Sequence, residues 1–591
     1  MPILRIFIII LNFAICLSCF AEEDYATLEK IVITAESTES ESQSYPSETF
    51  SSADINDKKI NSVPDAFRHA SGVDLRYRGT SGVQGDASIR GSTYEQVAIS
   101  IDGIKINDPQ TGHHNLDIPL TSFDIERMDI LKQGASSFYG AGALSGGINI
   151  VSKKPLKKST ELTAMGGQHA LFGQGFSFCM PGKDLSSSFS FEHKTTNGAR
   201  PNTDFDYETY SCILTKDWRD NSMDFVAGYQ DKEFGADSFY SNLYKEEEEH
   251  TKTLFLKTGL DTDLSSCNLN NSIFLRRHHD KFILNRNNPS FSQNTHTTYS
   301  YGIHSGAVWP VKYGDIETGF EISRDTIDST KLGKNTRMNE ALFLGFRPET
   351  GSRIEPDARF RIDHFQNWSF QKSSNLGLGY WLIEDSLKIK SSYSRSFRGP
   401  SFTELYYSDA ANKGDSDLKV EKSDNYNAGV EAKLYDIKVE CSGFLRKVKN
   451  TIDYTRPTAN DVWQATNLGN VDYKGVEFRA GPLSYTYIEA DRNNSGYLSK
   501  YALDILKHQL MLNLNHDIEG VKINWFLSYS ERKFGETYFK GDVAVSKTFK
   551  QKDSEIEPFL KIDNFTDTEY SEISGVTQPG RWTQAGIRLK W

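Results

Sequence analysis

Apolar and polar residues alternate along most of the chain between residue 156 and the C-terminus. In residues 426–434 and 437–445 every second residue is apolar or small, and only Tyr435 and Asp436 separate the two runs. Successive side chains of a β-strand point to opposite faces, so this period of two predicts strands with one apolar and one polar face. The same alternation recurs in residues 176–180, 223–229, 254–260, 299–307, 521–529 and 585–591.

The length of this region sets the number of strands. At roughly 20 residues per strand with its share of loop, residues 156–591 hold about 22 antiparallel strands, and a closed membrane β-barrel of that size has room for a plug. The gap at 435–436 predicts a tight turn, and the polar stretches 408–423 and 446–461 predict long loops at the other end. An array of soluble β-sandwiches is the alternative, but its water-facing surface does not need aromatic residues throughout.

The N-terminal residues 1–21 have the pattern of a secretory signal peptide. Arg5 precedes an apolar core, and small residues lead to a predicted cut after Ala21. Leu17-Ser18-Cys19 leaves a lipoprotein signal as an alternative, although Cys16 stands at the usual leucine position. No later stretch has the 18 or so consecutive apolar residues of a membrane-spanning helix.

Residues 22–52 form a polar arm that we expect to be disordered. One apolar, β-branched run interrupts it, and such a run can add as a strand to the sheet edge of a partner protein. Its residues are Lys30, Ile31, Val32, Ile33, Thr34 and Ala35.

Residues 53–155 are rich in glycine and predict a small α+β domain. Ser62 and Asp65 are placed to cap a short helix that ends by Gly72. Strands are predicted at 97–101, 104–106, 125–131 and 148–151. Asp102-Gly103 predicts the hairpin turn between the first two strands, and residues 75–87 are expected to form a loop.

Five short motifs in this region occur in a recognisable order. They are Ile89-Arg90-Gly91, Ile101-Asp102-Gly103, Glu126-Arg127 through Lys132, Tyr139-Gly140, and Gly146-Gly147-Ile148-Asn149-Ile150. In order and spacing they resemble the plug domain of TonB-dependent outer-membrane receptors. Lys132-Gln133-Gly134 departs from the family's frequent Arg-Gly-Pro. The alternative is a small glycine-rich α/β domain that is unrelated to these receptors and has another function.

Three stretches of the predicted barrel extend the resemblance. They are residues 394–406 with 418–423, residues 467–469 with 474–477, and residues 563–570 with 579–581. The terminal Trp591 resembles an outer-membrane insertion signal. The short length and compact plug look most like the cobalamin-receptor branch of the family.

The resemblance implies a function and a set of partners. A TonB-like periplasmic protein would grip residues 30–35, and the receptor would sit as a monomer among the lipids of the outer membrane of a Gram-negative-type bacterium. The ligand would be a scarce metal chelate, cobalamin or a ferric siderophore, with a glycan or other nutrient as the alternative. Two plug loops would contact it, through Arg76, Tyr77, Arg78, Ser81, Asn107, Asp108, Gln110, His113, His114 and Asn115.

Other function classes find less support in the sequence. The net charge of −12 argues against a nucleic-acid partner. We find no nucleophile elbow, H-E-x-x-H motif or phosphate loop, so we do not expect an enzyme. A β-barrel enzyme or adhesin and a passive porin remain as alternatives, and the porin is disfavoured by the predicted plug and arm.

No cofactor or metal site is assigned from the sequence. The adjacent His113 and His114 are treated as polar loop residues rather than metal ligands. Residues 246–249 are four glutamates, a composition that suits Ca²⁺ but is more usual in a solvated loop. Cys179, Cys212, Cys267 and Cys441 are scattered and predict packed or lipid-facing thiols, with disulfides left open.

Overall fold

The computed structural model describes residues 44–80, 82–240, 243–348, 353–492 and 496–591. The predicted signal peptide and the apolar run at 30–35 lie outside the described residues, as does Ser81. Among the described residues, no helix combines the length and the apolar character needed to cross a membrane.

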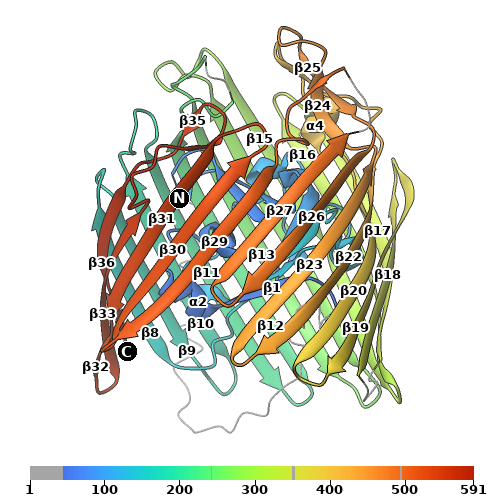
Figure 1. Cartoon of the computed structure of the whole chain (residues 1–591), viewed down its shortest axis with the longest axis vertical. Helices are drawn as coiled ribbons and strands as arrows, with labels where there is room; N and C mark the ends of the chain where they lie inside the picture. The colour runs from blue at the N-terminus through green and yellow to red at the C-terminus, as the bar shows by residue number, and fades with distance from the viewer. Residues whose placement is uncertain (1–43, 81, 241–242, 349–352, 493–495) are drawn as a thin grey trace.

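A closed antiparallel barrel surrounds the N-terminal region (Figure 1). Over the described residues it has 22 strands, with β31 and β32 taken as one because both pair with β33. The ring closes where β36 pairs with β8. The strands are β8 (Ser159–Gly167), β9 (Phe172–Met180), β10 (Ser186–Thr196), β11 (Phe205–Trp218), β12 (Asn221–Gly235), β13 (Glu248–Asp263), β14 (Asn268–Ile283), β15 (Gln293–Val311), β16 (Gly314–Ser329), β17 (Gly333–Pro348), β18 (Ile354–Phe365), β19 (Ser369–Ile383), β20 (Leu387–Arg398), β22 (Glu421–Leu434), β23 (Ile437–Lys449), β26 (Val471–Ala480), β27 (Leu483–Arg492), β29 (Leu506–Ile518), β30 (Val521–Arg532), β31 (Thr537–Lys547), β32 (Phe549–Gln551), β33 (Ser554–Asp563) and β36 (Trp582–Lys590).

The alternation predicted from the sequence separates the two faces of the wall. On β15, Tyr299, Tyr301 and Ile303 are exposed on the outside, whereas the alternating Thr298 and Ser300 are buried against the interior. An apolar outer face and a polar inner face are what a strand needs between lipid and a wet lumen. The predicted fold, a 22-stranded membrane barrel around a plug, is confirmed.

The hairpin predicted at residues 426–445 is confirmed in its register. Leu434 pairs with Ile437, and Tyr426 pairs with Leu445, so the apolar residues of the two runs face each other. Tyr435 turns the chain with a positive φ of 56°. Turns of this kind define one end of the barrel, here called the short-turn end. The opposite, long-loop end contains the connections 236–247, 284–292, 399–420 and 450–470.

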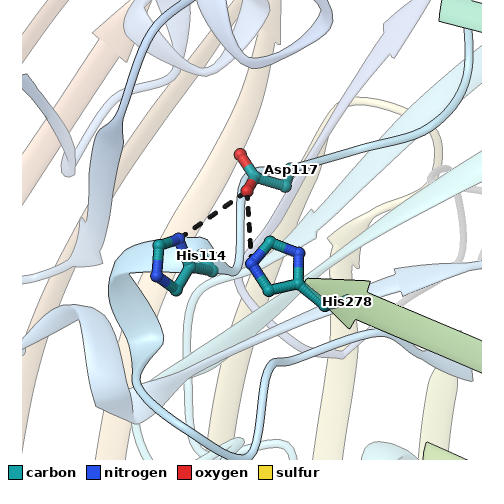
Figure 2. Close-up of side chains that lie close together, drawn as sticks. All are labelled: His114, Asp117 and His278. Atoms are coloured by element: carbon teal, nitrogen blue, oxygen red, sulfur yellow. Dashed lines mark ion pairs between the residues drawn. The ribbon is translucent and has the colours of Figure 1, made fainter. Parts of the chain in front are cut away.

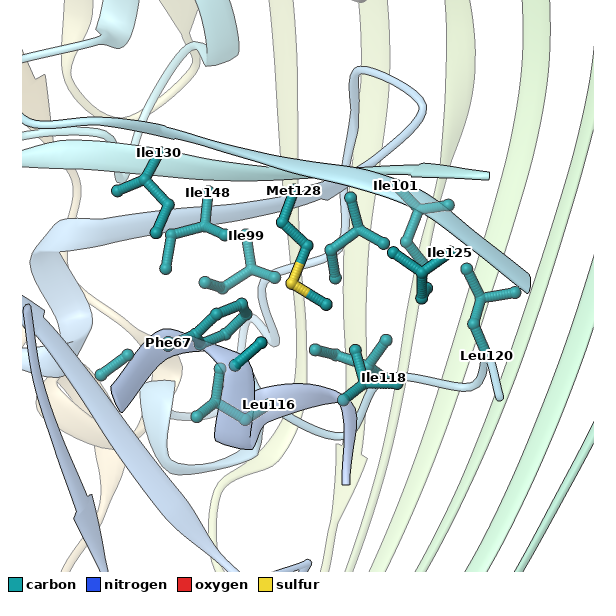
Figure 3. Packing of buried hydrophobic residues seen from close by; sticks show 14 of the residues in the cluster. Phe67, Ile99, Ile101, Leu116, Ile118, Leu120, Ile125, Met128, Ile130 and Ile148 are labelled. Carbon is teal, nitrogen blue, oxygen red and sulfur yellow. The ribbon is translucent and has the colours of Figure 1, made fainter. Parts of the chain in front are cut away.

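The plug lies inside the barrel and is built on a five-stranded sheet in the order β1-β6-β7-β4-β5. Its elements are β1 (Ser47–Ser51), α2 (Ser52–Asp57), η1 (Val63–His69), β2 (Val73–Tyr77), β3 (Gly85–Ile89), η2 (Tyr94–Gln96), β4 (Val97–Ile101), β5 (Ile104–Lys105), η3 (Gly112–His114), η4 (Ser122–Asp124), β6 (Ile125–Leu131), α3 (Ser136–Tyr139) and β7 (Gly146–Ser152). Figure 3 shows its apolar core, in which Phe67 of η1 packs under Ile99, Met128 and Ile148 of the sheet.

Most of the predicted plug elements are confirmed, with two differences. Asp102 and Gly103 both have positive φ, 47° and 76°, as the predicted hairpin turn requires. The segment capped by Ser62 and Asp65 is a 3₁₀-helix that ends at His69. The expectation of a loop over residues 75–87 is wrong at both ends, because β2 and β3 pair as a hairpin and leave only residues 78–84 as its tip.

Small elements cover the long-loop end of the barrel. They are the helix α4 (Phe402–Tyr406), the four-stranded sheet of β21 (Asn412–Lys413), β25 (Trp463–Asn467), β24 (Ile452–Arg456) and β28 (Leu498–Ser499), and the hairpin β34 (Ser571–Ile573) and β35 (Val576–Thr577). In Figure 1, β24, β25 and α4 stand above the rim of the barrel. The four cysteines of the described residues are free thiols.

Candidate functional site

The plug meets the long-loop end of the barrel through the segment 107–117, here called the plug loop. Its first anchor is Asp108, whose carboxylate accepts hydrogen bonds from Arg276 Nη1 at 2.6 Å and Thr298 Oγ1 at 3.1 Å. Arg276 on β14 is 2% exposed and also donates to the backbone oxygen of His114 at 3.3 Å. Burial alone raises the pKa of the Asp108 carboxyl, but Arg276 outweighs it and the net pKa is lowered. The plug loop is therefore held at its base by a buried ion pair.

A second anchor joins the plug loop to helix α4. The backbone oxygens of Pro109 and Gln110 accept hydrogen bonds from the backbone N–H groups of Phe402 and Thr403, at 2.9 and 3.0 Å. The capping box formed by Ser401 and Glu404 begins this helix. The sequence motif at 394–406 thus places a helix N-terminus directly over the plug loop.

His113 lies at the centre of an aromatic group. Its ring stacks on Tyr94 with centroids 4.1 Å apart, and its Nδ1 is 2.8 Å from Asp86 Oδ1. Burial lowers the pKa of His113 to about 4, although the Asp86 carboxylate acts in the opposite direction. Tyr240 and Tyr501, from two different barrel loops, approach the same ring edge-on.

These aromatic side chains extend toward the outer loops. Tyr501 lies 5.5 Å from Tyr94 and 6.5 Å from Tyr454 of β24, as measured between ring centroids. We call Tyr94, His113, Tyr240, Tyr454 and Tyr501 the aromatic cluster. Flat, amphipathic rings with polar tips suit contact with a large, partly polar ligand.

His114, the next residue, points instead into a group of charged side chains on the barrel wall. Its Nδ1 is 3.7 Å from Asp117 Oδ2, and its Nε2 is 3.5 Å from Asp280 Oδ2 and 3.7 Å from Glu249 Oε1. Figure 2 shows the Asp117 carboxylate between the rings of His114 and His278. Burial lowers the pKa of His114, but the surrounding carboxylates outweigh it and the net pKa is raised well above the ordinary value.

In the first predicted ligand loop, the side chains of Arg76, Tyr77 and Arg78 all bond to other groups of the protein. Arg76 donates to Asp74 and to Asp504, each at 2.7 Å. Tyr77 is 1% exposed and its hydroxyl donates to Asp65 at 2.7 Å. Arg78 contacts the backbone oxygen of Phe239 and lies over the ring of Tyr240.

The second predicted loop is also tied into the structure. Asn107 bonds the backbone of β4, and Asn115 accepts from the backbone N–H of Asp108 at 2.9 Å. Gln110 donates to Asp280 at 3.1 Å. The structure brings Arg78, His113, His114 and their neighbours together at one face, and their contact with a ligand stays a prediction.

The predicted plug motifs lie at the turns of the plug and at its contacts with the wall. Arg90 and Gly91 turn the chain after β3 with positive φ, and Arg90 pairs with Glu477 of β26. Asp102 accepts from Ser152 at 2.7 Å through both carboxylate oxygens. The other motif residues are Gly103 in the turn, Glu126 and Arg127 on β6, Tyr139 and Gly140 at the end of α3, and Gly146 and Gly147 on β7. At the C-terminus, the backbone of Trp591 pairs with Thr160.

The glutamate run at 246–249 does not converge on one point. Glu248 pairs with Arg286 at 2.9 Å, whereas Glu249 is buried beside Tyr240 and Gln84. Glu247 accepts from the backbone N–H of Tyr240 at 3.2 Å. Alternation at the start of β13 sends neighbouring glutamates to opposite faces.

Sequence reasoning did not single out several residues of this face. Tyr94, Tyr240, Tyr454 and Tyr501 come from four separate segments, and no local pattern links these segments to one another or to His278 and Asp280 on β14. The spacing of His278 and Asp280 was the one sequence signal for the residues on the barrel wall. His278 and Asp280 are two apart in a strand and so point to the same side.

Comparison with protein families identifies the chain. Residues 163–583 match the family model described as TonB dependent receptor-like, beta-barrel, and residues 39–147 match the TonB-dependent Receptor Plug Domain. The chain belongs to the TonB-dependent receptor family. Such a receptor is a transporter of the Gram-negative outer membrane and not an enzyme, and its uptake depends on TonB. The long-loop end is then the extracellular end.

Individual relatives of this TonB-dependent receptor are distant. The Vitamin B12 transporter BtuB of Vibrio cholerae is 23% identical over 509 residues, which cover 82% of this chain and 77% of the relative. The BtuB of Vibrio vulnificus is 20% identical over 485 residues, covering 78% and 76%. Among solved structures, the siderophore receptor PirA of Acinetobacter baumannii has a TM-score of 0.76 at 15% identity, covering 95% of this chain and all of that one. The ferric enterobactin receptor PfeA of Pseudomonas aeruginosa has a TM-score of 0.77 at 16% identity with the same coverage.

Proposed function

We propose that this receptor actively imports a scarce metal chelate, cobalamin or a ferric siderophore, and works as a monomer. The relatives found by sequence are named as vitamin B12 transporters, and the similar solved structures are siderophore receptors. Both ligand classes are large, bear polar groups at their edges and contain a metal already enclosed by its chelator. Cobalamin is the first candidate, because the BtuB likeness extends over most of the chain.

The observation that supports a ligand site best is the aromatic cluster at the extracellular end. It joins the plug, through Tyr94 and His113, to three barrel loops, through Tyr240, Tyr454 and Tyr501. A ligand that contacts these rings touches the plug and the loops at once. Ligand binding is then able to change the position of the plug relative to the wall, which is the structural requirement for coupling two sites.

The second of the two coupled sites is the arm that contains residues 30–35. We propose that a TonB-like periplasmic protein binds this run by strand addition and pulls on the plug, with energy from the inner membrane. The signal peptide (1–21), arm (22–52), plug (53–155) and barrel (156–591) are the proposed units of the chain. Glycans or other nutrients are the alternative cargo.

A passive channel is the rival function. It is disfavoured because the plug is pinned to the wall by buried ion pairs such as Asp108 with Arg276 and Arg90 with Glu477. A diffusion channel gains nothing from such pairs, since they hold in place a plug that occupies the lumen.

The cargo is tested by thermal unfolding of the purified receptor with cobalamin and with a panel of ferric siderophores. A ligand that binds only the native state stabilises it by RT ln(1 + c/Kd) at ligand concentration c, so the unfolding temperature rises with the logarithm of c once c exceeds Kd. We expect one chelate to raise it and the matching metal-free chelator to do so less. A panel in which only a glycan stabilises the protein would overturn the chelate assignment.

A further inference from the structure

Three buried side chains converge at the junction of plug and barrel. His114 and Asp117 belong to the plug loop and its continuation, and His278 belongs to β14 of the wall. Their side chains are 3%, 5% and 0% exposed. Asp117 Oδ2 is 3.7 Å from His114 Nδ1 and 3.8 Å from His278 Nε2 (Figure 2). The three ligand-type atoms all lie within 4.8 Å of one another.

These distances fit a shared cation better than direct bonding. Hydrogen bonds between nitrogen and oxygen are about 2.7–3.2 Å long, so neither contact of Asp117 Oδ2 is one. Two ligand atoms that each lie about 2.0–2.2 Å from a tetrahedral metal ion are roughly 3.4 Å apart. The two separations from Asp117 Oδ2, 3.7 and 3.8 Å, need only a small contraction to reach that geometry.

Two of these atoms have no other partner. Asp117 Oδ2 and His278 Nε2 are buried, and neither forms a hydrogen bond within the part of the chain that the structure describes. A buried polar atom left without a hydrogen bond destabilises the folded state. One cation between the two atoms would satisfy both.

In each of these three side chains, the polar atom that would not bind the metal contacts another protein group, which orients the side chain for metal binding. His278 Nδ1 lies 2.9 Å from Thr253 Oγ1. In the tautomer with the proton on Nδ1, this nitrogen donates to the hydroxyl oxygen and Nε2 keeps the lone pair that a metal requires. Asp117 Oδ1 accepts from Lys232 Nζ, which leaves Oδ2 for the site. His114 Nε2 faces Asp280 and Glu249. Metal-bound histidines usually donate their second N–H to such a carboxylate or carbonyl group.

We propose that His114 Nδ1, Asp117 Oδ2 and His278 Nε2 bind one divalent transition-metal ion of the zinc class. Two imidazoles and one carboxylate suit Zn²⁺ and its neighbours, whereas Ca²⁺ and Mg²⁺ prefer oxygen ligands alone. Three protein ligands leave a fourth position open on the metal.

His114, Glu249 and Asp280 form a second possible group around the other ring nitrogen. One neutral imidazole offers one lone pair, so both groups cannot be filled through the same ring. The first group is preferred because its Asp117 Oδ2 and His278 Nε2 form no hydrogen bond within the described residues. In the second group, Asp280 Oδ2 accepts from Gln110 and Glu249 Oε1 accepts from Tyr240.

The site connects the plug to the wall, because two ligands come from one and the third from the other. A bound metal therefore fixes the plug loop at the extracellular end. This proposal concerns metal binding alone and does not depend on which cargo is imported or on TonB coupling, so the two are tested separately.

The test is Zn²⁺ binding by the full receptor, purified in detergent with a tag that contains no histidine and freed of metal with a chelator. Isothermal titration should find one equivalent of tightly bound Zn²⁺. His278→Gln should weaken it by about 100-fold or more, since even changes to groups behind a metal ligand cost 10–100-fold. The matched control is His250→Gln, because His250 pairs with Asp231 and lies outside the site. A heat-modifiability gel checks that each variant is a folded barrel.

A second measurement does not depend on the variants. Co²⁺ added to the metal-free protein should give the visible absorption of a low-symmetry site with imidazole ligands. Failure of the wild-type protein to bind Zn²⁺, equal binding by His278→Gln, or the spectrum of hydrated Co²⁺ would each overturn the proposal. In that case His114 is a protonated side chain paired with carboxylates.

Discussion

Arg90 of the plug and Glu477 of β26 form a two-bond ion pair across the junction of plug and barrel. Arg90 Nε donates to Glu477 Oε1 at 2.9 Å and Nη2 donates to Oε2 at 2.7 Å. The guanidinium also lies over the ring of Phe444 at 4.4 Å. Arg90 and Glu477 belong to two short sequence motifs that lie far apart along the chain, and the fold brings the two motifs into contact.

Glu477→Ala is expected to loosen the plug without unfolding the barrel. Removing one partner of a buried ion pair costs about 3–5 kcal/mol, because the other charge stays buried and unpaired. Hydrogen exchange of residues 85–91 should become faster in the variant, and cells should admit more of a large antibiotic that the intact outer membrane excludes.

The control for this prediction lies on the same strand. Lys474 pairs with Glu489 and Asp491 at an exposed position, so Lys474→Ala should change neither measurement. Equal exchange in Glu477→Ala and the wild-type protein would show that the pair does not hold the plug.

The Glu95 carboxyl group, which bonds to the plug loop, should make the stability of the receptor depend on pH. Its Oε1 accepts from the backbone N–H of Gly112 at 2.8 Å. Burial and then repulsion by Glu404 raise the pKa of Glu95 to about 8 from an ordinary 4.5, against the effect of Arg398. A carboxyl group whose pKa is higher in the folded than in the unfolded protein stabilises the fold at pH values below its unfolded pKa. This stabilisation is lost as the pH rises toward the folded pKa.

Glu95→Gln should therefore match the wild-type unfolding temperature near pH 5 and exceed it at pH 9. The gain should reach about 1 kcal/mol or more, since one pKa unit corresponds to about 1.4 kcal/mol. Thermal unfolding of both proteins from pH 5 to pH 9 gives the comparison. A difference that stays constant over this range would contradict the raised pKa.

Regular elements were predictable because their physical cause is local. The alternation in residues 426–445 requires one face of each strand to be apolar, and a two-residue gap leaves one register, which the pairing of Tyr426 with Leu445 confirms. Asp102-Gly103 likewise turns where positive φ is tolerated. The loop expected over residues 75–87 is wrong at its ends, because Gly, Ser and Arg are typical of loops and only the pairing of Leu75 with Ala87 and of Tyr77 with Gly85 makes those ends strands.

The functional face was only partly predictable, because its residues meet through tertiary structure. The plug loop was expected from its position after a tight hairpin, and the structure adds how firmly it is bonded by Asp108 and Gln110. Tyr240 and Tyr501 come from barrel loops far apart in the sequence and have no sequence signature that joins them to His113. Their convergence depends on closure of the whole barrel.

Tyr501→Ala tests the aromatic cluster as a ligand surface. Loss of one ring contact should weaken binding of the identified cargo by about tenfold, which is roughly 1.4 kcal/mol. Equilibrium binding to intact cells measures it. Tyr313→Ala is the control, since Tyr313 is exposed in the short turn between β15 and β16. Unchanged affinity in Tyr501→Ala would place the ligand elsewhere.

TonB-dependent import by this receptor is tested most directly by Val32→Pro in the arm. Proline removes a backbone donor and opposes strand pairing. We therefore expect the TonB-like protein proposed to bind residues 30–35 to lose this added strand. The control is Ser40→Pro, which lies in the same arm outside the apolar run. Cargo binding to cells and cargo uptake by energised cells are measured side by side. We expect unchanged binding in both variants and uptake reduced to background in Val32→Pro alone. Uptake at the wild-type rate in this variant would contradict TonB-dependent import.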